Sequence, residues 1–343
     1  MRGSVLVTGV AGFIGFHVAR RLLADGQQVF GIDDLNGSYD PRLKQARLAL
    51  LTRHADFRFK AFDIAERAAT AELFAAERFT DVVHLAAQAG VAQSLIDPAA
   101  YVEANLVGFA NVLEGCRHGG CRHLLYASSS SVYGANTRMP LRTSDNVDHP
   151  LSLYGATKKA DELMAHAYAH LFALPATGLR FFTVYGPWGR PDMAIWLFTE
   201  AILAGQPVRL FNHGQMRRDF TYIDDVVEAV VRLIPRPPQR APAGAQAQAG
   251  PATSAAPWRI YNIGGGRTVE LNRLVDIIEQ AVGKPAQREF LPMRPVDVLE
   301  TCADCADLER AVGFAPNVPI EDGIRSFVDW YREFHLSGQT SRA

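Results

Sequence analysis

The chain has 343 residues, of which 48% are hydrophobic and 21% charged, a composition typical of an ordinary globular protein. Its formal net charge of −1 argues against a nucleic-acid surface, and no apolar run approaches the roughly 20 residues that span a bilayer. Four cysteines in this length argue against a disulfide-stapled secreted domain, so we expect a cytoplasmic protein without nucleic-acid or membrane partners.

Strand-like and helix-like segments alternate through the first half of the chain. The β-prone runs cover residues 4–8, 29–33, 57–62, 82–85, 123–127 and 176–182. Helical apolar spacing covers residues 13–24, 43–51, 70–77, 102–116 and a long segment that begins near Tyr154. This alternation predicts an α/β fold with a doubly wound, Rossmann-like parallel sheet that carries helices on both faces.

The pattern loosens after Gly186, where we expect a smaller, mainly C-terminal α/β lobe. The later elements are expected at residues 196–204, 208–211, 223–233, 259–263, 271–282 and about 320–334. The expected division gives a first domain of residues 1–184 plus about 217–265, and a second lobe of about 185–216 and 266–335. Residues 235–257, rich in Pro, Ala and Gln, are expected to form a flexible surface excursion.

A glycine-rich turn joins the first expected strand to the first helix. Gly9, Gly12 and Gly15 have the spacing G-x-x-G-x-x-G, and Phe13 and Ile14 open the helix. Glycine lets a pyrophosphate approach the backbone, and the helix N-terminus offers free N–H groups. Three glycines also occur in ordinary loops, so this turn predicts a dinucleotide site only together with the segments that follow.

The second expected strand ends in Asp33-Asp34. A carboxylate there accepts hydrogen bonds from the adenosine ribose and repels the extra phosphate of NADP. We therefore predict that the first domain binds NAD, with Asp33 as the ribose ligand and Asp34 as the alternative. Two later strand ends supply further expected cofactor contacts, which could also be plain turn residues: Asp63, Ile64, Leu85, Ala86 and Ala87.

Tyr154 and Lys158 lie four residues apart in the long helix and therefore share a face. An ammonium beside a phenol stabilises the phenolate, which can act as a general base. A half-buried tyrosine beside a surface lysine is the alternative. Ser129, in the serine run at the end of the preceding strand, can hydrogen-bond a substrate hydroxyl, or the run can be a polar turn.

These motifs resemble the extended short-chain dehydrogenase/reductases, the NAD-dependent epimerase/dehydratase family of sugar-nucleotide enzymes. The similar segments are T-G-x-x-G-F-I-G, S-S-S-S-V-Y-G, Y-x-x-x-K and R-D-F-T-Y-I-D-D, and the match covers nearly the whole chain. The resemblance implies NAD as cofactor, a UDP-sugar substrate and a homodimer. It also implies roles for Ser129 as the catalytic hydroxyl, Tyr154 as the base and Lys158 as a ligand of the nicotinamide ribose, so that both Tyr154 and Lys158 contact the cofactor.

The same resemblance assigns residues to the substrate. It places Arg218 on the substrate diphosphate and Asp297 near the uridine ribose, although Pro-Val-Asp stands here where the family commonly has Pro-Gly-Asp. Dehydratases and decarboxylases of the family have an acid just before Val-Tyr-Gly, where this chain has Ser130 and Ser131. The resemblance therefore implies C4 epimerisation through a 4-keto sugar rather than elimination, with Ser130 among the substrate contacts.

Residues 180–192 are similar to UDP-glucuronate 4-epimerases in particular. A 4-keto uronate is a β-keto acid that readily loses CO2, and charge-assisted hydrogen bonds can hold its carboxylate away from the geometry of bond cleavage. We predict this role for Arg190 and Thr183, and UDP-glucuronate, converted to UDP-galacturonate, as the favoured substrate. Arg190 as a solvated loop residue and Thr183 as a diphosphate ligand are the alternatives.

Three other functions are compatible with these residues. A UDP-glucose/UDP-galactose 4-epimerase shares every catalytic residue and lacks only the carboxylate clamp. A non-catalytic NAD-binding regulator would have the fold without turnover. A dehydrogenase would carry out net oxidation. No metal site is expected, because the C-x-x-C spacing of Cys302 and Cys305 has no second pair or histidine cluster.

Overall fold

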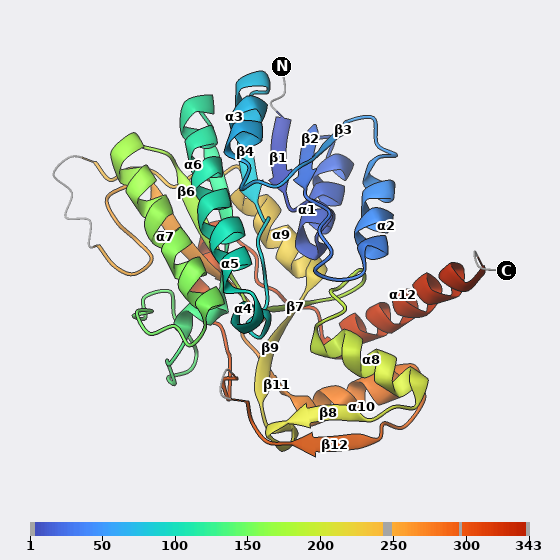
Figure 1. Cartoon of the computed structure of the whole chain (residues 1–343). Coiled ribbons are helices and arrows are strands. Elements are labelled where there is room, and N and C mark those ends of the chain that lie inside the picture. Colours follow the sequence, from blue (N-terminus) through green and yellow to red (C-terminus); the bar gives the residue numbers. More distant parts are fainter. Residues whose placement is uncertain (1–3, 243–248, 295–296, 341–343) are drawn as a thin grey trace.

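The computed structural model describes residues 4–242, 249–294 and 297–340, and its centre is one large parallel sheet (Figure 1). Seven strands lie in the order β10-β6-β5-β4-β1-β2-β3, and each neighbouring pair is parallel. The strands are β1 (Ser4–Thr8), β2 (Val29–Asp33), β3 (Phe57–Ala61), β4 (Phe79–His84), β5 (His123–Ser129), β6 (Ala176–Phe181) and β10 (Trp258–Ile263). The doubly wound fold predicted from the sequence is confirmed.

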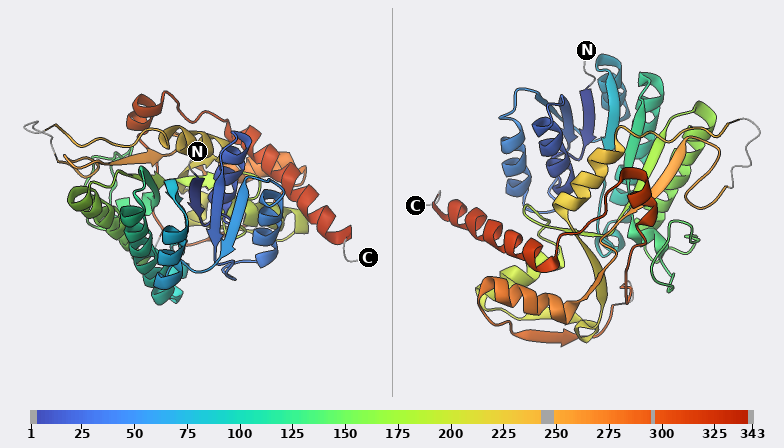
Figure 2. Two further views of the ribbon diagram at one scale, coloured as in Figure 1. Left: turned by 90° about the horizontal axis from the view of Figure 1, so that it is seen from above. Right: turned by 180° about the vertical axis from the view of Figure 1, so that it is seen from behind.

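Helices cover both faces of this sheet (Figure 2). One face carries α1 (Phe13–Ala24), α2 (Pro41–Leu51), α9 (Ile223–Leu233) and α11 (Ala306–Val312). The other carries α3 (Arg67–Ala76), α6 (Gly108–Gly119) and α7 (Leu153–Phe172). Because successive side chains of a strand point to opposite faces, Val5 and Val7 of β1 enter the first core while Leu6 enters the second.

The second lobe has a core of its own. Strand β8 (Val208–Phe211) pairs in parallel with β12 (Arg288–Leu291). Helices α8 (Ala194–Ala204), α10 (Leu271–Val282) and α12 (Ile320–Thr340) pack with this pair, and α12 projects from the molecule (Figure 1). A small sheet of β11 (Thr268–Glu270), β9 (Arg217–Tyr222) and β7 (Thr183–Tyr185) runs between the large sheet and this lobe.

The structure differs from the sequence prediction mainly before α6. The helix expected over 102–116 begins as a π-helical turn (Val102–Val107) and continues as α6. Two short helices that were not expected, α4 (Gln93–Ile96) and α5 (Pro98–Tyr101), precede it. The buried Asn105 accounts for the irregularity, because its amide pairs with both backbone groups of Gln88 and donates to the Thr157 hydroxyl. The short elements β7, β9, β11, β12 and α11 were not predicted either, since each is too short to show a period.

The segment expected to be a surface excursion is partly packed. Residues 243–248 lie outside the described residues. In the described flanks, Ala252 and Ala256 are buried in the core under α7, and the Ser254 hydroxyl pairs with His166 of α7. Small side chains, which made the segment resemble a linker, are also those that fit closely against a helix. No helix in the described part of the chain is long and apolar enough to cross a bilayer.

Three buried histidines make stability depend on pH. Burial lowers the pKa of His17 and His84 from 6.5 to about 3, and that of His123 to about 4. Below pH 6.5, the pKa of these imidazoles in the unfolded chain, the unfolded chain binds protons that the native chain does not. Stability therefore falls as the pH falls. Burial also raises the pKa of Asp161 to about 6, which partly offsets the loss. We expect the free energy of unfolding to drop by about 3 kcal/mol between about pH 7 and pH 5.5.

Urea unfolding at the two pH values measures this difference. His118→Gln is the matched control, because the His118 side chain is 68% exposed and should not alter the pH dependence. A free energy of unfolding that stays level or rises toward the lower pH would contradict the assignment of three neutral, buried imidazoles.

Candidate active site

A cavity of about 580 Å³ lies at the carboxyl ends of the parallel strands, and every residue predicted for the site lines it. From the expected cofactor site it is lined by Gly9, Gly12, Phe13, Ile14, Gly15, Asp33, Asp63, Ile64, Leu85, Ala86 and Ala87. From the expected catalytic and substrate sites it is lined by Ser129, Ser130, Tyr154, Lys158, Thr183, Arg190, Arg218 and Asp297. Residues that lie far apart in the chain thus share one cavity because parallel strands end at one edge.

The glycine-rich turn has no room for a side chain at its glycine positions. Gly9 has a φ of +67°, and a Cβ there would lie 2.7 Å from the backbone nitrogen of Ala86. A Cβ on Gly15 would lie 2.1 Å from the Gly9 carbonyl oxygen. Gly12 caps α1 without a side-chain hydrogen bond, so the turn offers bare backbone and helix N–H groups to the cavity. These features fit a dinucleotide pyrophosphate.

A buried hydroxyl joins this turn to the end of β4. Thr8 Oγ1 accepts hydrogen bonds from the backbone N–H groups of Leu85 and Ala86, each at 3.0 Å. It also pairs with Nδ1 of His84 at 2.8 Å. His84 is therefore a packed core histidine, and the residues that follow it form part of the cavity wall.

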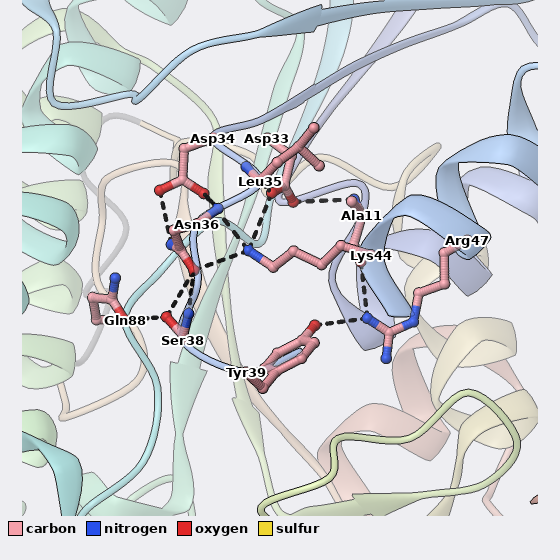
Figure 3. Close-up of polar contacts among 10 residues, drawn as sticks. All are labelled: Ala11, Asp33, Asp34, Leu35, Asn36, Ser38, Tyr39, Lys44, Arg47 and Gln88. Carbon is pink, nitrogen blue, oxygen red and sulfur yellow. Dashed lines mark hydrogen bonds and ion pairs between the residues drawn. The ribbon is translucent and has the colours of Figure 1, made fainter. Parts of the chain in front are cut away.

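Asp33 lies at the centre of a polar cluster at the end of β2 (Figure 3). Its carboxylate accepts from the backbone N–H groups of Ala11 and Leu35, at 3.1 and 2.9 Å. The buried ammonium of Lys44 lies 3.3 Å from Asp33 and donates to Asn36 at 3.1 Å. The carboxylate is thus held in place next to the glycine turn, where the ribose of a dinucleotide would lie.

Asp63 and Ile64 form the next part of the wall. The Asp63 carboxylate accepts from the Ala65 N–H at 2.9 Å, which closes the turn after β3. Ile64 packs against Gly108, where a Cβ would lie 2.7 Å from its side chain. With the glycine turn and Asp33, these groups form a cradle that fits NAD.

Tyr154 and Lys158 open α7, which faces the serine run at the end of β5. Ser152 caps the helix by accepting from the Gly155 N–H at 3.0 Å. The Ser129 hydroxyl, 7% exposed, accepts from the Ser131 N–H at 3.1 Å, and so its own proton can be donated into the cavity. Ser129, Tyr154 and Lys158 thus lie in one cavity, as the sequence predicted, with a cradle for the cofactor beside them.

The ammonium of Lys158 is buried and paired. Its Nζ lies 3.0 Å from Asp161 Oδ2, one turn along α7, and both side chains are 1% exposed. Burial raises the pKa of Asp161 to about 6 although the ammonium opposes the shift. The pair fixes the Lys158 side chain within the helix face that carries Tyr154.

Arg190 lies at the cavity wall and not in bulk water, since its side chain is 24% exposed. It donates to the Asp192 carboxylate and, at 3.1 Å, to the Ala89 carbonyl. Burial lowers the pKa of Arg190, but Asp192 more than offsets this and the pKa is raised. Within the part of the chain that the structure describes, these hydrogen bonds use Nε and Nη2, so Nη1 can donate to another acceptor.

Arg218 and Asp297 lie at the other end of the cavity. Arg218 donates to the carbonyls of Arg217 and Leu299, and burial lowers its pKa. Asp297 pairs with Arg294 at 2.8 and 2.9 Å. Arg294 has no predicted role and does not line the cavity, and its charge is paired with that of Asp297.

Helix α2 supplies residues that the sequence prediction missed. Lys44 lines the cavity and Arg47 lies behind it, together with Tyr39 from the preceding loop. The signal was present, because Leu43, Lys44, Arg47 and Leu51 have the spacing of one helix face and all four are buried. Two cationic side chains on a buried helix face indicate that acceptors or anions from other segments lie against that face.

No metal site is present among the described residues, where no group of three or more His, Cys, Asp or Glu is placed to hold an ion. All four cysteines are free thiols. Cys305 Sγ donates to the Gly264 carbonyl at 3.2 Å, so the C-x-x-C spacing serves the packing of a loop.

Comparison with known proteins agrees with this geometry. Residues 5–250 match the NAD dependent epimerase/dehydratase family. A probable UDP-glucuronate 4-epimerase of Rhizobium meliloti is 48% identical over 98% of this chain and 99% of its own length. UDP-glucuronate 4-epimerase 3 of Arabidopsis thaliana is 43% identical over 98% of this chain and 78% of its own length.

Solved structures give the same result. The UDP-glucuronic acid 4-epimerase of Bacillus cereus, in complex with UDP-glucuronic acid and NAD, superposes with a TM-score of 0.84 at 31% identity, over 96% of this chain and 99% of that one. The UDP-glucose 4-epimerase of Thermotoga maritima with UDP-glucose gives 0.83 at 29% identity, over 96% and 99%. The resemblance deduced from the motifs is confirmed, and this chain belongs to the NAD dependent epimerase/dehydratase family.

Proposed function

We propose that this protein is an NAD-dependent 4-epimerase that interconverts UDP-glucuronate and UDP-galacturonate. The observation that carries the proposal is the presence of Arg190 in the same cavity as Ser129 and Tyr154, with an Nη1 that no hydrogen bond among the described residues uses. The relatives that act on the uronate, named above, support it. When bound, NAD supplies reversible oxidation of the C4 alcohol.

Three residues bind the C4 hydroxyl and transfer its proton. Ser129 donates a hydrogen bond to the C4 oxygen, and Tyr154 takes the hydroxyl proton as a general base. Lys158, whose ammonium lies on the same helix face, stabilises the phenolate and holds the nicotinamide ribose. After the 4-keto sugar has turned in the cavity, Tyr154 returns the proton to the C4 oxygen. Ser130 provides a further contact to the sugar.

Charged and polar side chains hold the rest of the substrate, and the described part of the site has no acid placed to eliminate water from it. Arg190 and Thr183 hold the C5 carboxylate, while Arg218 and Asp297 hold the UDP. The residues before Val132 are serines, so no carboxylate stands where proton abstraction at the neighbouring carbon would need one. The 4-keto intermediate therefore returns to an alcohol and does not lose water.

Product analysis tests this function. The purified protein is incubated with UDP-glucuronate or UDP-glucose without added reductant, and the nucleotide sugars are separated and identified. UDP-galacturonate from the first substrate and nothing from the second is the expected result. Conversion of UDP-glucose instead would assign the neutral-sugar activity, net formation of NADH a dehydrogenase, and no turnover of either sugar a regulator.

We further propose a division into an NAD-binding domain of residues 1–184 plus about 217–265 and a sugar-nucleotide lobe of about 185–216 and 266–335. Helix α11 departs from this division, because it packs on the large sheet beside α9 and β10. The separate core of α8, α10 and α12 supports it. A cytoplasmic location is supported by the four free thiols, which a reducing compartment preserves.

We also propose a homodimer that pairs through α4, the π-helical turn and α7. Helix α4 and the π-helical turn each contact α7, and the three elements expose large apolar side chains, namely Leu95, Ile96, Val102 and Leu163. A patch of this kind typically marks an interface. Leu163 is 59% exposed, and Leu163→Arg should convert the dimer to a monomer because a charge is costly to bury at an apolar interface.

Analytical ultracentrifugation measures the change. Leu197→Arg on α8 is the matched control, since Leu197 is 47% exposed on the other lobe and should leave the dimer intact. A wild-type monomer, or a Leu163→Arg dimer of unchanged affinity, would exclude this interface.

A further inference from the structure

The segment that carries Arg190 is tied to the first domain through its backbone. The carbonyl of Pro187 pairs with Nε2 of His17 on α1 at 2.9 Å. The next two carbonyls, of Trp188 and Gly189, accept from Nη2 of Arg47 on α2 at 2.5 and 3.3 Å. Three successive carbonyls are thus held by two side chains, and Arg190 is the next residue along the chain.

The same guanidinium also holds the glycine-rich turn (Figure 3). Nη1 of Arg47 donates to the Ala11 carbonyl at 2.9 Å and to the Tyr39 hydroxyl at 2.7 Å. Ala11 lies between Gly9 and Gly15, at the position expected for the cofactor pyrophosphate. Arg47 is therefore the direct link between the cofactor turn and the segment that ends in Arg190.

This link is costly, which argues against incidental packing. The Arg47 side chain is fully buried, its Nε has no hydrogen-bond partner, and no carboxylate among the described residues forms an ion pair with it. Burial lowers its pKa, although Tyr39 and the carboxylate of Asp33 favour the charged form, and Arg190 repels it. A buried cation whose partners are neutral oxygens persists only where the surrounding structure compensates for it.

The segment itself is held in a strained conformation. Trp188 has a φ of +63°, in the left-handed region that a large side chain rarely adopts. Its ring packs between Phe16 of α1 and two rings of α12, Trp330 and Phe334. Such strain is retained where contacts from several elements determine the backbone, and it is common at functional sites.

We propose that Arg47 is a positioning residue that sets the place of Arg190 relative to the bound cofactor, and through it the place of the sugar carboxylate. The inference rests on the proposed function. In the 4-keto uronate, loss of CO2 breaks the bond from C5 to the carboxylate and leaves its electron pair as an enolate. Protonation at C5 gives a UDP-4-keto-pentose, which becomes a UDP-pentose when the hydride taken from C4 is returned. This requires the carboxylate to stand out of the plane of the ketone, and a fixed Arg190 prevents that geometry.

Product partition in Arg47→Met tests the inference. Methionine fills much of the same space but donates no hydrogen bond, so Arg190 should become mobile. We expect the share of decarboxylated UDP-pentose among the products to rise at least tenfold and KM for UDP-glucuronate to rise. Arg47→Lys, which keeps one charge but cannot bridge both segments, should give an intermediate partition and serves if the methionine variant does not fold.

A control separates positioning from stability. Leu51→Ala removes a fully buried side chain from the same helix α2, and should lower the melting temperature without changing the product partition. If Arg47→Met lowers stability or NAD content while its partition equals that of the wild type, Arg47 is merely structural and the inference fails.

Binding measurements keep this inference distinct from the proposed function. A wild-type protein that does not convert UDP-glucuronate would contradict the proposed epimerase activity. Even without turnover, calorimetry with UDP-glucuronate and with UDP-xylose, which lacks the carboxylate, measures how much the carboxylate contributes to binding. A loss of affinity in Arg47→Met confined to the uronate supports the positioning role, and equal losses for the two ligands overturn it.

Discussion

Tyr154→Phe is expected to reduce the rate of epimerisation by about 10²- to 10⁴-fold, the usual contribution of a positioned general base. The change removes one oxygen atom and keeps the ring, which packs edge-on against Tyr101 with centroids 6.0 Å apart. Without the phenol, no group in the serine run can accept the proton of the C4 hydroxyl at neutral pH. Because the cradle of glycines and Asp33 is untouched, NAD should still be bound.

Initial rates with UDP-glucuronate, together with the NAD content of the purified variant, measure this. Tyr168→Phe is the control, because the Tyr168 hydroxyl of α7 donates to Glu114 of α6 and neither residue lines the cavity, so the rate should be unchanged. A Tyr154→Phe enzyme that retains more than about a tenth of the activity would exclude the phenol as the base.

Arg190→Ala is expected to lower kcat/KM for UDP-glucuronate by about 30- to 1000-fold, which corresponds to roughly 2–4 kcal/mol for truncating one partner of a desolvated charge pair. The carboxylate would lose its charge-assisted hydrogen bonds, and part of the 4-keto intermediate should lose CO2 and appear as UDP-pentose. Binding of UDP-xylose should change little, because that sugar has no carboxylate.

The products of single and multiple turnovers, separated by chromatography, measure the loss and the partition. Arg42→Ala is the control, since the Arg42 side chain is 70% exposed on α2 and pairs only with Asp40 among the described residues. Unchanged kinetics and products in Arg190→Ala would mean that another group holds the carboxylate.

The fold could be predicted from the sequence because its strongest signals are local. The buried strands β1, β2 and β4 are short apolar runs, and α9 and α10 begin and end at the predicted residues because each has a long amphipathic period. In the second lobe, β8 was predicted at its observed residues, whereas β12, its partner about 80 residues along the chain, was not. The π-helical turn depends on one buried amide, that of Asn105.

The candidate site divides in the same way. Residues at strand ends or in short motifs, such as Gly9, Asp33 and Tyr154, were predicted because their neighbours in the sequence identify them. Arg47 was missed because its partners lie as much as 142 residues away. Lys44 was missed although its partner Asp33 is only 11 residues earlier, because the sequence does not show that α2 folds back onto the end of β2. Only the folded chain shows that one guanidinium joins the cofactor turn to the segment of Arg190.

Transfer of a C4 deuterium label tests the central claim most directly. UDP-glucuronate deuterated at C4 is converted in ordinary water, and the UDP-galacturonate is analysed by mass spectrometry and NMR. The account predicts that the deuterium remains at C4, because the hydrogen removed from that carbon as hydride does not exchange with water before it is returned. Replacement of the label by solvent hydrogen would show that C4 is inverted by proton exchange, which would contradict transient oxidation at this site.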